Sequence, residues 1–344
     1  MTEIRVLAVD DSMLFREMLT KGMKRFPDIK VVGVAADPFD AKDKIVALRP
    51  DVVTLDIEMP CMDGIKFLHN LMPQYPLPVV IISSLRESVF EAMDAGAVDF
   101  LAKPDEMSGN MDAFVGEVAA KIRVASTAKF AFRKDAPKDI KLHAMELGVP
   151  ADPLDLVAIG ASTGGTEAIF SVLTKYRSNM PGFVIVQHMP EGFTKLFAKR
   201  LNSSTALRVK EAEEGDEVRP GMALIAPAGR HMRVLDSERG YTIRVEEGAK
   251  VSGHRPSVDV LFDSVAKAAG HRAIGVILTG MGADGAAGLK KIADAGGYTI
   301  GQDERSSVVY GMPMAAYLTG AVMVQLPLYR IPDEILRKLE SRSQ

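Results

Sequence analysis

The chain has 344 residues, 47% of them hydrophobic, a single cysteine and a formal net charge of -3. This length exceeds the usual size of one domain, so we expect two, and the mixed charge without a long basic run argues against a nucleic-acid partner. The single cysteine excludes an internal disulfide, while early charges and strand-length apolar runs argue against a signal peptide or direct membrane insertion, so we expect a cytoplasmic protein.

Short apolar runs alternate with amphipathic stretches in the first part of the chain. The apolar runs predict strands at 4–11, 29–36, 52–60, 77–84 and 97–104. The amphipathic stretches predict helices at 15–26 and 38–50 and a closing helix at 111–125. Strands that alternate with helices are typical of a doubly wound parallel sheet, so we expect an α/β domain over residues 1–122.

The alternation breaks over residues 123–152. Prolines lie near charges there and no clean period shows, so we interpret this segment as a linker. A second alternating series predicts an α/β domain with a parallel sheet over 153–344, with a small antiparallel excursion near 208–247. Its apolar runs lie at 156–160, 183–188, 222–227, 241–247, 273–280, 298–303 and 321–326.

Five polar residues are expected at strand ends of the first domain: Asp10, Asp11, Asp56, Ser83 and Lys103. The carboxyl ends of parallel strands meet in one crevice. Three carboxylates there would repel one another without a divalent cation, and an oxygen-only site suits Mg2+. The lysine and serine can hold phosphoryl oxygens, and an aspartate beside Mg2+ is a competent phosphoryl acceptor. Each residue alone could be an ordinary polar cap, but five together favour a phosphoryl site.

Four motifs carry these residues: "VDDS", "DIEMPCMDG", "IISS" and "DFLAKP". They resemble the receiver domain of two-component response regulators over residues 1–122. The resemblance implies a flavodoxin-like fold, phosphorylation on Asp56, and a switch that uses Ser83, Lys103 and the aromatic Phe100. It also implies an Mg2+ site built by Asp10, Asp11, Asp56 and the backbone carbonyl of Glu58.

The stretch "LVAIGASTGG" at 156–165 ends a predicted strand in Ser162 and two glycines, directly before a helix-like sequence. Such a turn can hold a phosphate or a nucleophile. A P-loop would need a Lys-Ser or Lys-Thr pair after Gly165, and a dinucleotide site would need an acidic residue at the end of the second strand. That strand ends in His188 instead. A serine and an imidazole at neighbouring strand ends are suited to nucleophilic catalysis.

A serine and histidine pair needs a third group to orient the imidazole, and Asp284 follows the predicted strand at 273–280. Taken singly, Ser162 could be a helix N-cap, His188 a core histidine and Asp284 a turn residue. Their joint placement at three strand ends favours a catalytic triad. Backbone N–H groups near this site could form an oxyanion hole, and the candidates are Thr163, Gly164 and Met281.

The motifs "GASTGG", "VQHMP", "SGHRPSVDVLF" and "LTGMGADG", joined in this order to a receiver, resemble the CheB family of chemotaxis protein-glutamate methylesterases. The resemblance spans nearly the whole chain. It implies hydrolysis of glutamate methyl esters, and deamidation of certain glutamines, on the cytoplasmic domains of chemoreceptors. The phosphodonor would be the chemotaxis histidine kinase, and the esterase reaction would need no cofactor.

The same resemblance implies roles for individual residues. Ser162 would be the nucleophile, His188 the general base and then acid, and Asp284 the orienting carboxylate. The motif "GHRPSVD" suggests that His254 and Arg255 lie at a substrate-facing edge, although Arg255 could equally pair with a carboxylate elsewhere.

A protein of another class is the alternative: a response regulator whose second domain only binds DNA or a small phosphate ligand. A DNA effector should show a basic recognition helix, which the balanced charge opposes. A phosphate-binding module would leave His188 and Asp284 without a task. We therefore expect a phosphorylation-regulated serine esterase.

Overall fold

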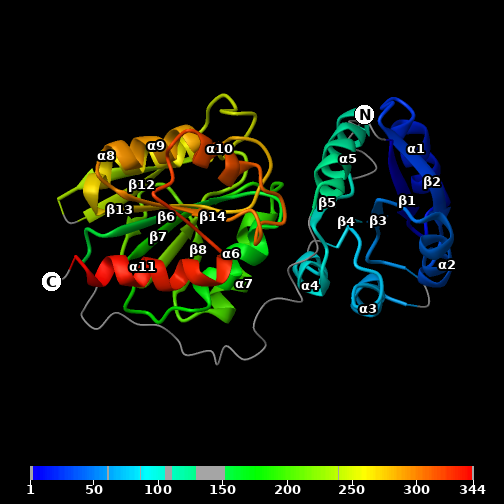
Figure 1. Ribbon diagram of the computed structural model, residues 1–344, viewed down its shortest axis with the longest axis horizontal. Coiled ribbons are helices and arrows are strands. Elements are labelled where there is room, and N and C mark those ends of the chain that lie inside the picture. Colours follow the sequence, from blue (N-terminus) through cyan, green and yellow to red (C-terminus); the bar gives the residue numbers. More distant parts are fainter. Residues whose placement is uncertain are drawn as a thin grey trace. The chain divides into compact units, whose positions relative to one another are not determined.

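The computed structural model describes residues 3–59, 62–85, 87–104, 111–128, 152–238 and 240–342. The chain divides into two compact units, Met1–Phe130 and Ala131–Gln344. Each unit is built on a parallel sheet with helices on both faces (Figure 1). Among the helices described, none combines the length and apolar character needed to cross a membrane.

The strands of the first unit are β1 (Ile4–Val9), β2 (Ile29–Ala35), β3 (Val52–Leu55), β4 (Val79–Ser83) and β5 (Asp99–Ala102). Its helices are α1 (Met13–Met23), α2 (Pro38–Leu48), α3 (Gly64–Leu71), α4 (Val89–Ala95) and α5 (Met111–Ser126). The strand order β2-β1-β3-β4-β5 confirms the expected flavodoxin-like fold. Helix α1 packs with α5, and α3 packs with α2 and α4, so the two groups cover opposite faces of the sheet.

Local sequence explains where these helices begin. The Ser12 hydroxyl accepts from the backbone N–H of Phe15 at the start of α1, and the Asp37 and Asp63 carboxylates cap α2 and α3 in the same way. Each cap satisfies N–H groups that the helix itself leaves unpaired. Strands β3 and β4 are buried at every position, as expected for parallel strands covered on both faces.

Helix α5 continues to Ser126, past residue 122 where we expected the linker to begin. Val124 and Ala125 are buried, which keeps the last turn of the helix packed on its own unit. The greater part of the expected linker, residues 129–151, lies outside the described residues.

The main strands of the second unit are β6 (Leu156–Ala161), β7 (Gly182–Gln187), β8 (Arg208–Glu211), β10 (Met222–Ile225), β13 (Ala273–Ile277), β14 (Tyr298–Gln302) and β15 (Val324–Leu326). They form one parallel sheet in the order β15-β14-β13-β6-β7-β10-β8. The chain enters at β6, builds the sheet outward through β7, and later returns to β13 on the other side of β6. A reversal of this kind leaves a crevice at the carboxyl ends of the strands, where ligands bind in such folds.

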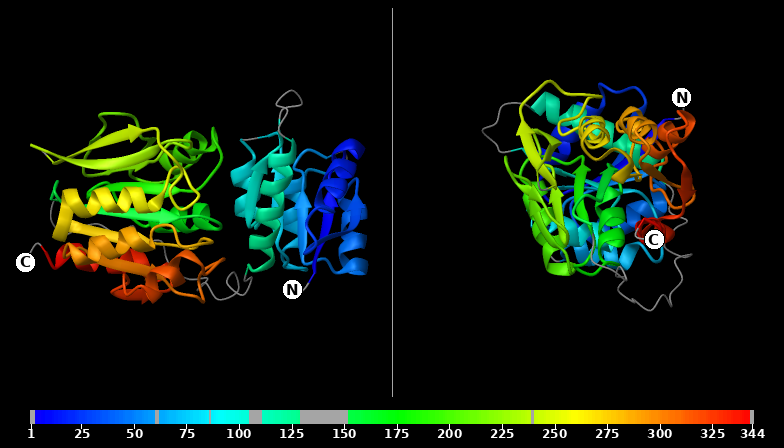
Figure 2. Two further views of the ribbon diagram at one scale, coloured as in Figure 1. Left: turned by 90° about the horizontal axis from the view of Figure 1, so that it is seen from above. Right: turned by 90° about the vertical axis from the view of Figure 1, so that its left-hand side faces the viewer.

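Helices cover both faces of this second sheet (Figure 2). They are α6 (Gly165–Leu173), α7 (Phe193–Ser204), α8 (Val258–Ala269), α9 (Ala286–Asp294), α10 (Met312–Leu318) and α11 (Ile331–Glu340). Helix α9 packs with α8 and α10, while α6 packs with α7 and α11. Burial of the apolar side chains between sheet and helices stabilises the unit by roughly 1.5–3 kcal/mol for each Val, Leu, Ile or Phe.

The antiparallel excursion is smaller than we expected. Within the described part of 208–247, the strands that pair in antiparallel fashion are β9 (Glu217–Val218), β11 (His231–Ser237) and β12 (Gly240–Glu246), whereas β8 and β10 join the main sheet as parallel strands. The prediction for 208–247 was therefore wrong for these two strands. The reason lies in β10, where Ala223, Leu224 and Ile225 are all buried, as suits a strand covered on both faces.

Candidate active site

Ser162 and His188 lie at neighbouring strand ends because β6 and β7 run parallel and in register. Ala161 pairs with Gln187, and the His188 N–H donates to the Ala161 carbonyl at 3.1 Å. Ser162 and His188 are the next residues after this registered pair. Asp284 follows β13, the neighbour of β6 on its other side. Three adjacent strand ends thus bring the three expected residues to one edge of the sheet.

The imidazole of His188 is joined to Asp284. Its Nε2 lies 2.8 Å from Asp284 Oδ2, and the two side chains are only 8% and 1% exposed. The other ring nitrogen, Nδ1, is buried and has no hydrogen-bond partner within the described part of the chain. With Nε2 donating to the carboxylate, Nδ1 is the nitrogen that can accept a proton.

The N-terminus of α8 holds the Asp284 carboxylate. Oδ1 accepts from the Ser257 hydroxyl (2.7 Å) and the Asp259 N–H (3.0 Å), and Oδ2 accepts from the Val258 N–H (2.8 Å). Burial alone would raise the pKa of Asp284, but the hydrogen bond and charge of His188, with these donors, outweigh it and hold the pKa below its ordinary value.

Sequence reasoning missed the part that Ser257 plays. This serine is the N-cap of α8, where its Oγ accepts from the Val260 N–H, and it also donates to Asp284. A serine directly before the apolar stretch "VDVLF" is an N-cap signal that was present in the sequence. Its contact with Asp284 depends on the loop after β13 and has no local signature.

Neither Ser162 nor His188 has the ordinary structural role that it could have had alone, a helix N-cap for the serine and a satisfied core residue for the histidine. Helix α6 has Gly164 as its N-cap, with φ of +76°, so Ser162 does not cap it. His188 differs from a satisfied core histidine because its Nδ1 has no hydrogen-bond partner among the residues that the structure describes. His231 is a satisfied core histidine for comparison. It is 3% exposed, its Nε2 bonds the Ala249 carbonyl at 2.9 Å, and its Nδ1 accepts from the Ser257 N–H at 3.3 Å.

The loop after β13 presses against the nucleophile. A Cβ on Gly280 would lie 2.7 Å from Ser162 Cβ, so only glycine allows this approach. Met281 follows, half exposed, and its N–H donates to no acceptor among the residues described. The buried Thr279 hydroxyl donates to the Thr163 carbonyl at 3.0 Å and so ties the two loops together. Two of the candidate oxyanion donors, Thr163 and Gly164, therefore follow Ser162 directly, and the third, Met281, follows the glycine that approaches it.

His254 and Arg255 lie at the same site, but they make different contacts. The His254 ring stacks on the His188 ring, with centroids 3.7 Å apart and an interplanar angle of 7°. Arg255 Nη1 donates to the Gly248 carbonyl at 2.6 Å, and Nε is buried without a partner in the described chain. Among the described residues, therefore, no carboxylate pairs with Arg255.

The first unit gathers its charged residues around Lys103. The Nζ atom lies 2.7 Å from Asp10 Oδ2 and 2.5 Å from Asp56 Oδ2. Carboxylate oxygens of Asp10, Asp11 and Asp56 all lie within 4.8 Å of one another. Burial raises the pKa of Asp10, and the hydrogen bond and charge of Lys103 oppose this rise only in part. Burial alone would lower the pKa of Lys103, but the carboxylates of Asp10 and Asp56 outweigh it and raise that pKa. Three hard oxygen donors at one point fit Mg2+.

Of the remaining expected residues of this site, Glu58 lies in the loop after β3, Ser83 ends β4 and Phe100 lies on β5. The Glu58 N–H donates to Asp56 Oδ1 at 3.2 Å, which places the Glu58 backbone beside the acidic cluster. Ser83 is fully buried at the end of β4, and its carbonyl accepts from the Lys103 N–H at 3.0 Å. Phe100 is buried on β5 with its ring edge-on to Phe90, the centroids 6.0 Å apart.

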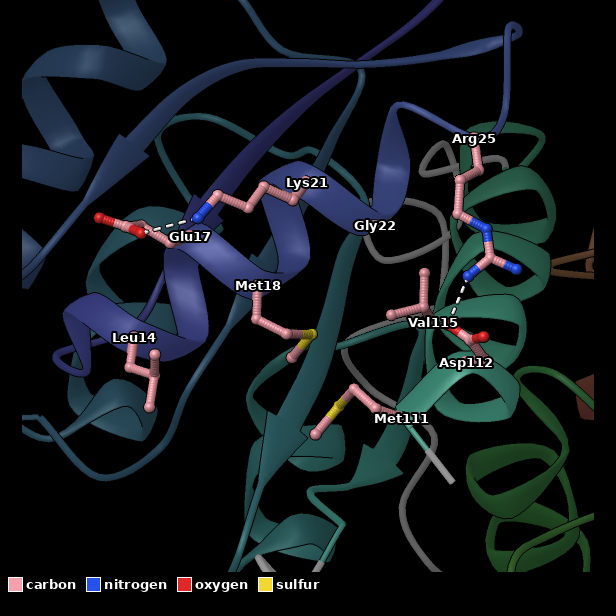
Figure 3. Close-up of a pocket in the computed structure, with 9 residues that line it drawn as sticks. All are labelled: Leu14, Glu17, Met18, Lys21, Gly22, Arg25, Met111, Asp112 and Val115. Carbon is pink, nitrogen blue, oxygen red and sulfur yellow. Dashed lines mark hydrogen bonds and ion pairs between the residues drawn. The ribbon is translucent and has the colours of Figure 1, made fainter. Parts of the chain in front are cut away.

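A groove of about 410 Å3 lies between α1 and α5 of the first unit (Figure 3). The charged side chains at its rim already pair with one another, Lys21 with Glu17 at 3.2 Å and Arg25 with Asp112 at 2.5 Å. Its lining contains none of the residues of either charged or catalytic cluster, so we assign no chemistry to it. The lining residues are Leu14, Glu17, Met18, Lys21, Gly22, Arg25, Met111, Asp112 and Val115.

Comparison with known proteins gives a consistent result for both units. The family described as CheB methylesterase matches residues 157–335, and the response regulator receiver domain matches residues 6–112. A protein-glutamate methylesterase/protein-glutamine glutaminase 2 of Syntrophomonas wolfei is 52% identical over 335 residues, 97% of each chain. A protein-glutamate methylesterase/protein-glutamine glutaminase of Syntrophotalea carbinolica is 49% identical over 348 residues, 99% of each chain.

Among solved structures, the CheB methylesterase catalytic domain of Thermotoga maritima is similar to the second unit. It is 38% identical, with a TM-score of 0.53, and the match covers 54% of this chain and 98% of that one.

Proposed function

Because the chain belongs to the CheB methylesterase family and carries a response regulator receiver domain, we propose that it hydrolyses glutamate methyl esters and deamidates specific glutamines on chemoreceptors. The chain is accordingly a hydrolase of chemotaxis, a protein-glutamate methylesterase/protein-glutamine glutaminase. Its substrates would be the cytoplasmic domains of methyl-accepting chemoreceptors, and its phosphodonor the chemotaxis histidine kinase. Both partners would meet it in the cytoplasm. The proposed division is a receiver over 1–122, a linker over 123–152, whose first residues continue α5 to Ser126, and an esterase domain over 153–344.

The observation that carries the proposal is the state of the His188 ring. Nε2 is held by Asp284 at 2.8 Å and Nδ1 is left without a partner in the described chain, next to the strand end that bears Ser162. In the first step, Ser162 Oγ attacks the ester carbonyl carbon while its proton passes to Nδ1. Asp284 keeps the proton on Nε2 and stabilises the imidazolium that forms.

The tetrahedral intermediate then collapses to an acyl-enzyme. The N–H groups of Thr163, Gly164 and Met281 would stabilise the negative oxygen. His188 returns its proton to the leaving group, which departs as methanol from an ester or as ammonia from a glutamine. A water molecule then gives a proton to His188 and attacks the acyl carbon. As glutamate is released, His188 passes this proton to Ser162 Oγ, which restores both residues.

Two neighbours would shape the approach of the substrate. His254 restrains the plane of the His188 ring by stacking on it at 3.7 Å. Arg255 Nη1 is held by the Gly248 carbonyl and Nε is buried, so Nη2 is the guanidinium nitrogen that a substrate at this edge would meet.

The receiver would control this site through phosphorylation of Asp56. Mg2+, when bound, would offset the negative charge of the phosphoryl group during its transfer. The groups that would hold the ion are the carboxylates of Asp10, Asp11 and Asp56 and the carbonyl of Glu58. Lys103 and the Ser83 hydroxyl would donate to phosphoryl oxygens, and Phe100 would report the change to the surface.

Active-serine labelling tests the proposal directly. A fluorophosphonate should form a covalent adduct on Ser162 in the wild-type chain and none in Ser162→Ala. Methanol release from methylated receptor membranes should then follow the same pattern and rise when a phosphodonor is added. An unlabelled but folded wild-type chain would contradict the serine mechanism and favour a domain that only binds.

A further inference from the structure

Gln187 connects the two residues of the proposed nucleophile and base. It is the last residue of β7 and only 3% exposed. Its Nε2 donates to the Ser162 carbonyl at 2.8 Å and to the His188 carbonyl at 3.1 Å. The bond from the His188 N–H to the Ala161 carbonyl joins the two strands at this same end of the ladder. One buried amide group therefore joins the backbones of Ser162 and His188 where the strands part.

The orientation of this amide follows from its partners. Both neighbours of Nε2 are carbonyl oxygens, which only accept, so the NH2 group must face them. The amide oxygen then turns toward Gly165, where a Cβ would lie 2.1 Å from Oε1. Glycine at the first position of α6 is thus what makes room for the Gln187 side chain.

The arrangement leaves Gln187 Oε1 buried without a hydrogen-bond partner in the described chain. A buried acceptor without a partner destabilises the folded state, and such groups are rare in native proteins. An apolar side chain of the same length would remove this orphaned acceptor, but it would also remove both donated bonds. The amide therefore supplies two directed bonds at the pair at the expense of one unsatisfied acceptor.

We propose that Gln187 is a positioning residue, which sets the separation of Ser162 and His188 through their backbones and touches no substrate itself. This inference rests on the proposed function. Proton transfer from Ser162 Oγ to His188 Nδ1 requires hydrogen-bond reach, and a misplacement of about 1 Å can cost about 100-fold in rate.

A pair of matched variants tests the proposal. Gln187→Met keeps the length of the side chain and removes both donors. Thr299→Val is the control. Thr299 is fully buried near the amino end of β14, two strands away from β6, and its hydroxyl accepts from the Met323 N–H at 3.1 Å, so this variant also removes a buried side-chain hydrogen bond but not at the pair. We expect Gln187→Met to lower the rate of fluorophosphonate labelling, and kcat for methanol release, by about 10- to 100-fold. KM should stay unchanged, and Thr299→Val should keep its rates within about threefold of wild type.

A second measurement separates positioning from a general loss of structure. In a His188→Ala background the pair no longer exists, so adding Gln187→Met should change the residual rate by less than about twofold. Should Gln187→Met fail to fold, Gln187→Asn serves instead, since it keeps the amide but is too short to reach both carbonyls.

Three results would overturn the proposal. They are labelling of Gln187→Met at the wild-type rate, equal losses in Gln187→Met and Thr299→Val, or a full further loss in the His188→Ala background. A wild-type chain that is not labelled at all would instead overturn the proposed function, so the two failures are distinguishable.

Discussion

Replacing Asp284 by asparagine perturbs the most connected group of the esterase site. Oδ2 accepts from His188 Nε2 and the Val258 N–H, and Oδ1 accepts from the Ser257 hydroxyl and the Asp259 N–H. The NH2 of an asparagine must face one of these two pairs. Ser257 Oγ can accept from it without a change in the tautomer of His188, so we expect the NH2 to replace Oδ1.

The size of the effect follows from the bonds that change. The bond to His188 becomes neutral, and a hydrogen bond to a charged group is worth about 1.5–3 kcal/mol against about 1 kcal/mol for a neutral one. A loss of about 1–2 kcal/mol in the transition state lowers the rate about 5- to 30-fold. An inverted tautomer would cost far more, about 10⁴-fold in a serine protease triad.

Stability should fall as well, because the Asp259 N–H is left facing an NH2 group. A buried N–H without a partner costs about 1–3 kcal/mol of unfolding free energy. For a unit of this size each kcal/mol lowers Tm by about 2–4 °C, so we expect a drop of roughly 2–12 °C.

The difference in stability should depend on pH in a defined direction. The pKa of Asp284 lies below its ordinary value in the folded protein, so the ionised carboxylate stabilises the fold at any pH above the unfolded pKa of about 3.9. This contribution is lost as pH falls through the folded pKa. Wild type and Asp284→Asn should therefore differ fully near neutral pH and converge in acid.

Methanol release gives the rate and scanning calorimetry gives Tm, with Ser162→Ala as the floor for activity. A loss of less than about threefold in a folded Asp284→Asn protein would refute an orienting role for the carboxylate. A loss that reaches the Ser162→Ala floor would refute the argument about which way the amide turns.

Gly280→Ala should lower the rate by about 100-fold or more, because its Cβ would lie 2.7 Å from Ser162 Cβ and 2.4 Å from Met312 Sδ, and a near-normal rate would show that the loop yields. Gly116→Ala, with open space around it in α5, should instead stabilise the first unit by about 0.4–1 kcal/mol, which calorimetry would detect. Asp56→Asn should keep basal methanol release and lose stimulation by acetyl phosphate, and a chelator should do the same to wild type; persistent stimulation would exclude this phosphoryl site. A fragment of residues 150–344 should release methanol faster than the unphosphorylated full chain, and an equal or slower rate would mean that the receiver activates rather than inhibits.

Much of the fold was predictable because strand and helix patterns are local. The buried runs at 156–160 and 273–280 read as strands without any knowledge of their neighbours, since parallel strands covered on both faces are apolar throughout. The direction in which β8 and β10 pair was not predictable in this way. Their pairing depends on where β7 lies, which no short stretch of sequence records.

The same distinction between local pattern and long-range contact applies to the residues of the site. Ser162, His188 and Asp284 each follow an apolar run directly, so their placement at strand ends could be inferred, and their catalytic roles stay predictions. The hydroxyl of Ser257 was not inferred as a partner of Asp284, because a helix N-cap and a loop separated by 27 positions meet only in the folded chain.

By itself the sequence determined which residues stand at the ends of buried strands, and this was enough to predict two doubly covered parallel sheets and the chemistry at their edges. Only the tertiary structure decided which nitrogen of His188 faces Asp284, that His254 stacks on that ring, and that Gln187 joins the carbonyls on both sides of the pair. The physical reason is that strand and helix periodicity is set by neighbours along the chain. The direction of a hydrogen bond or the plane of a ring is set by atoms that only folding brings together.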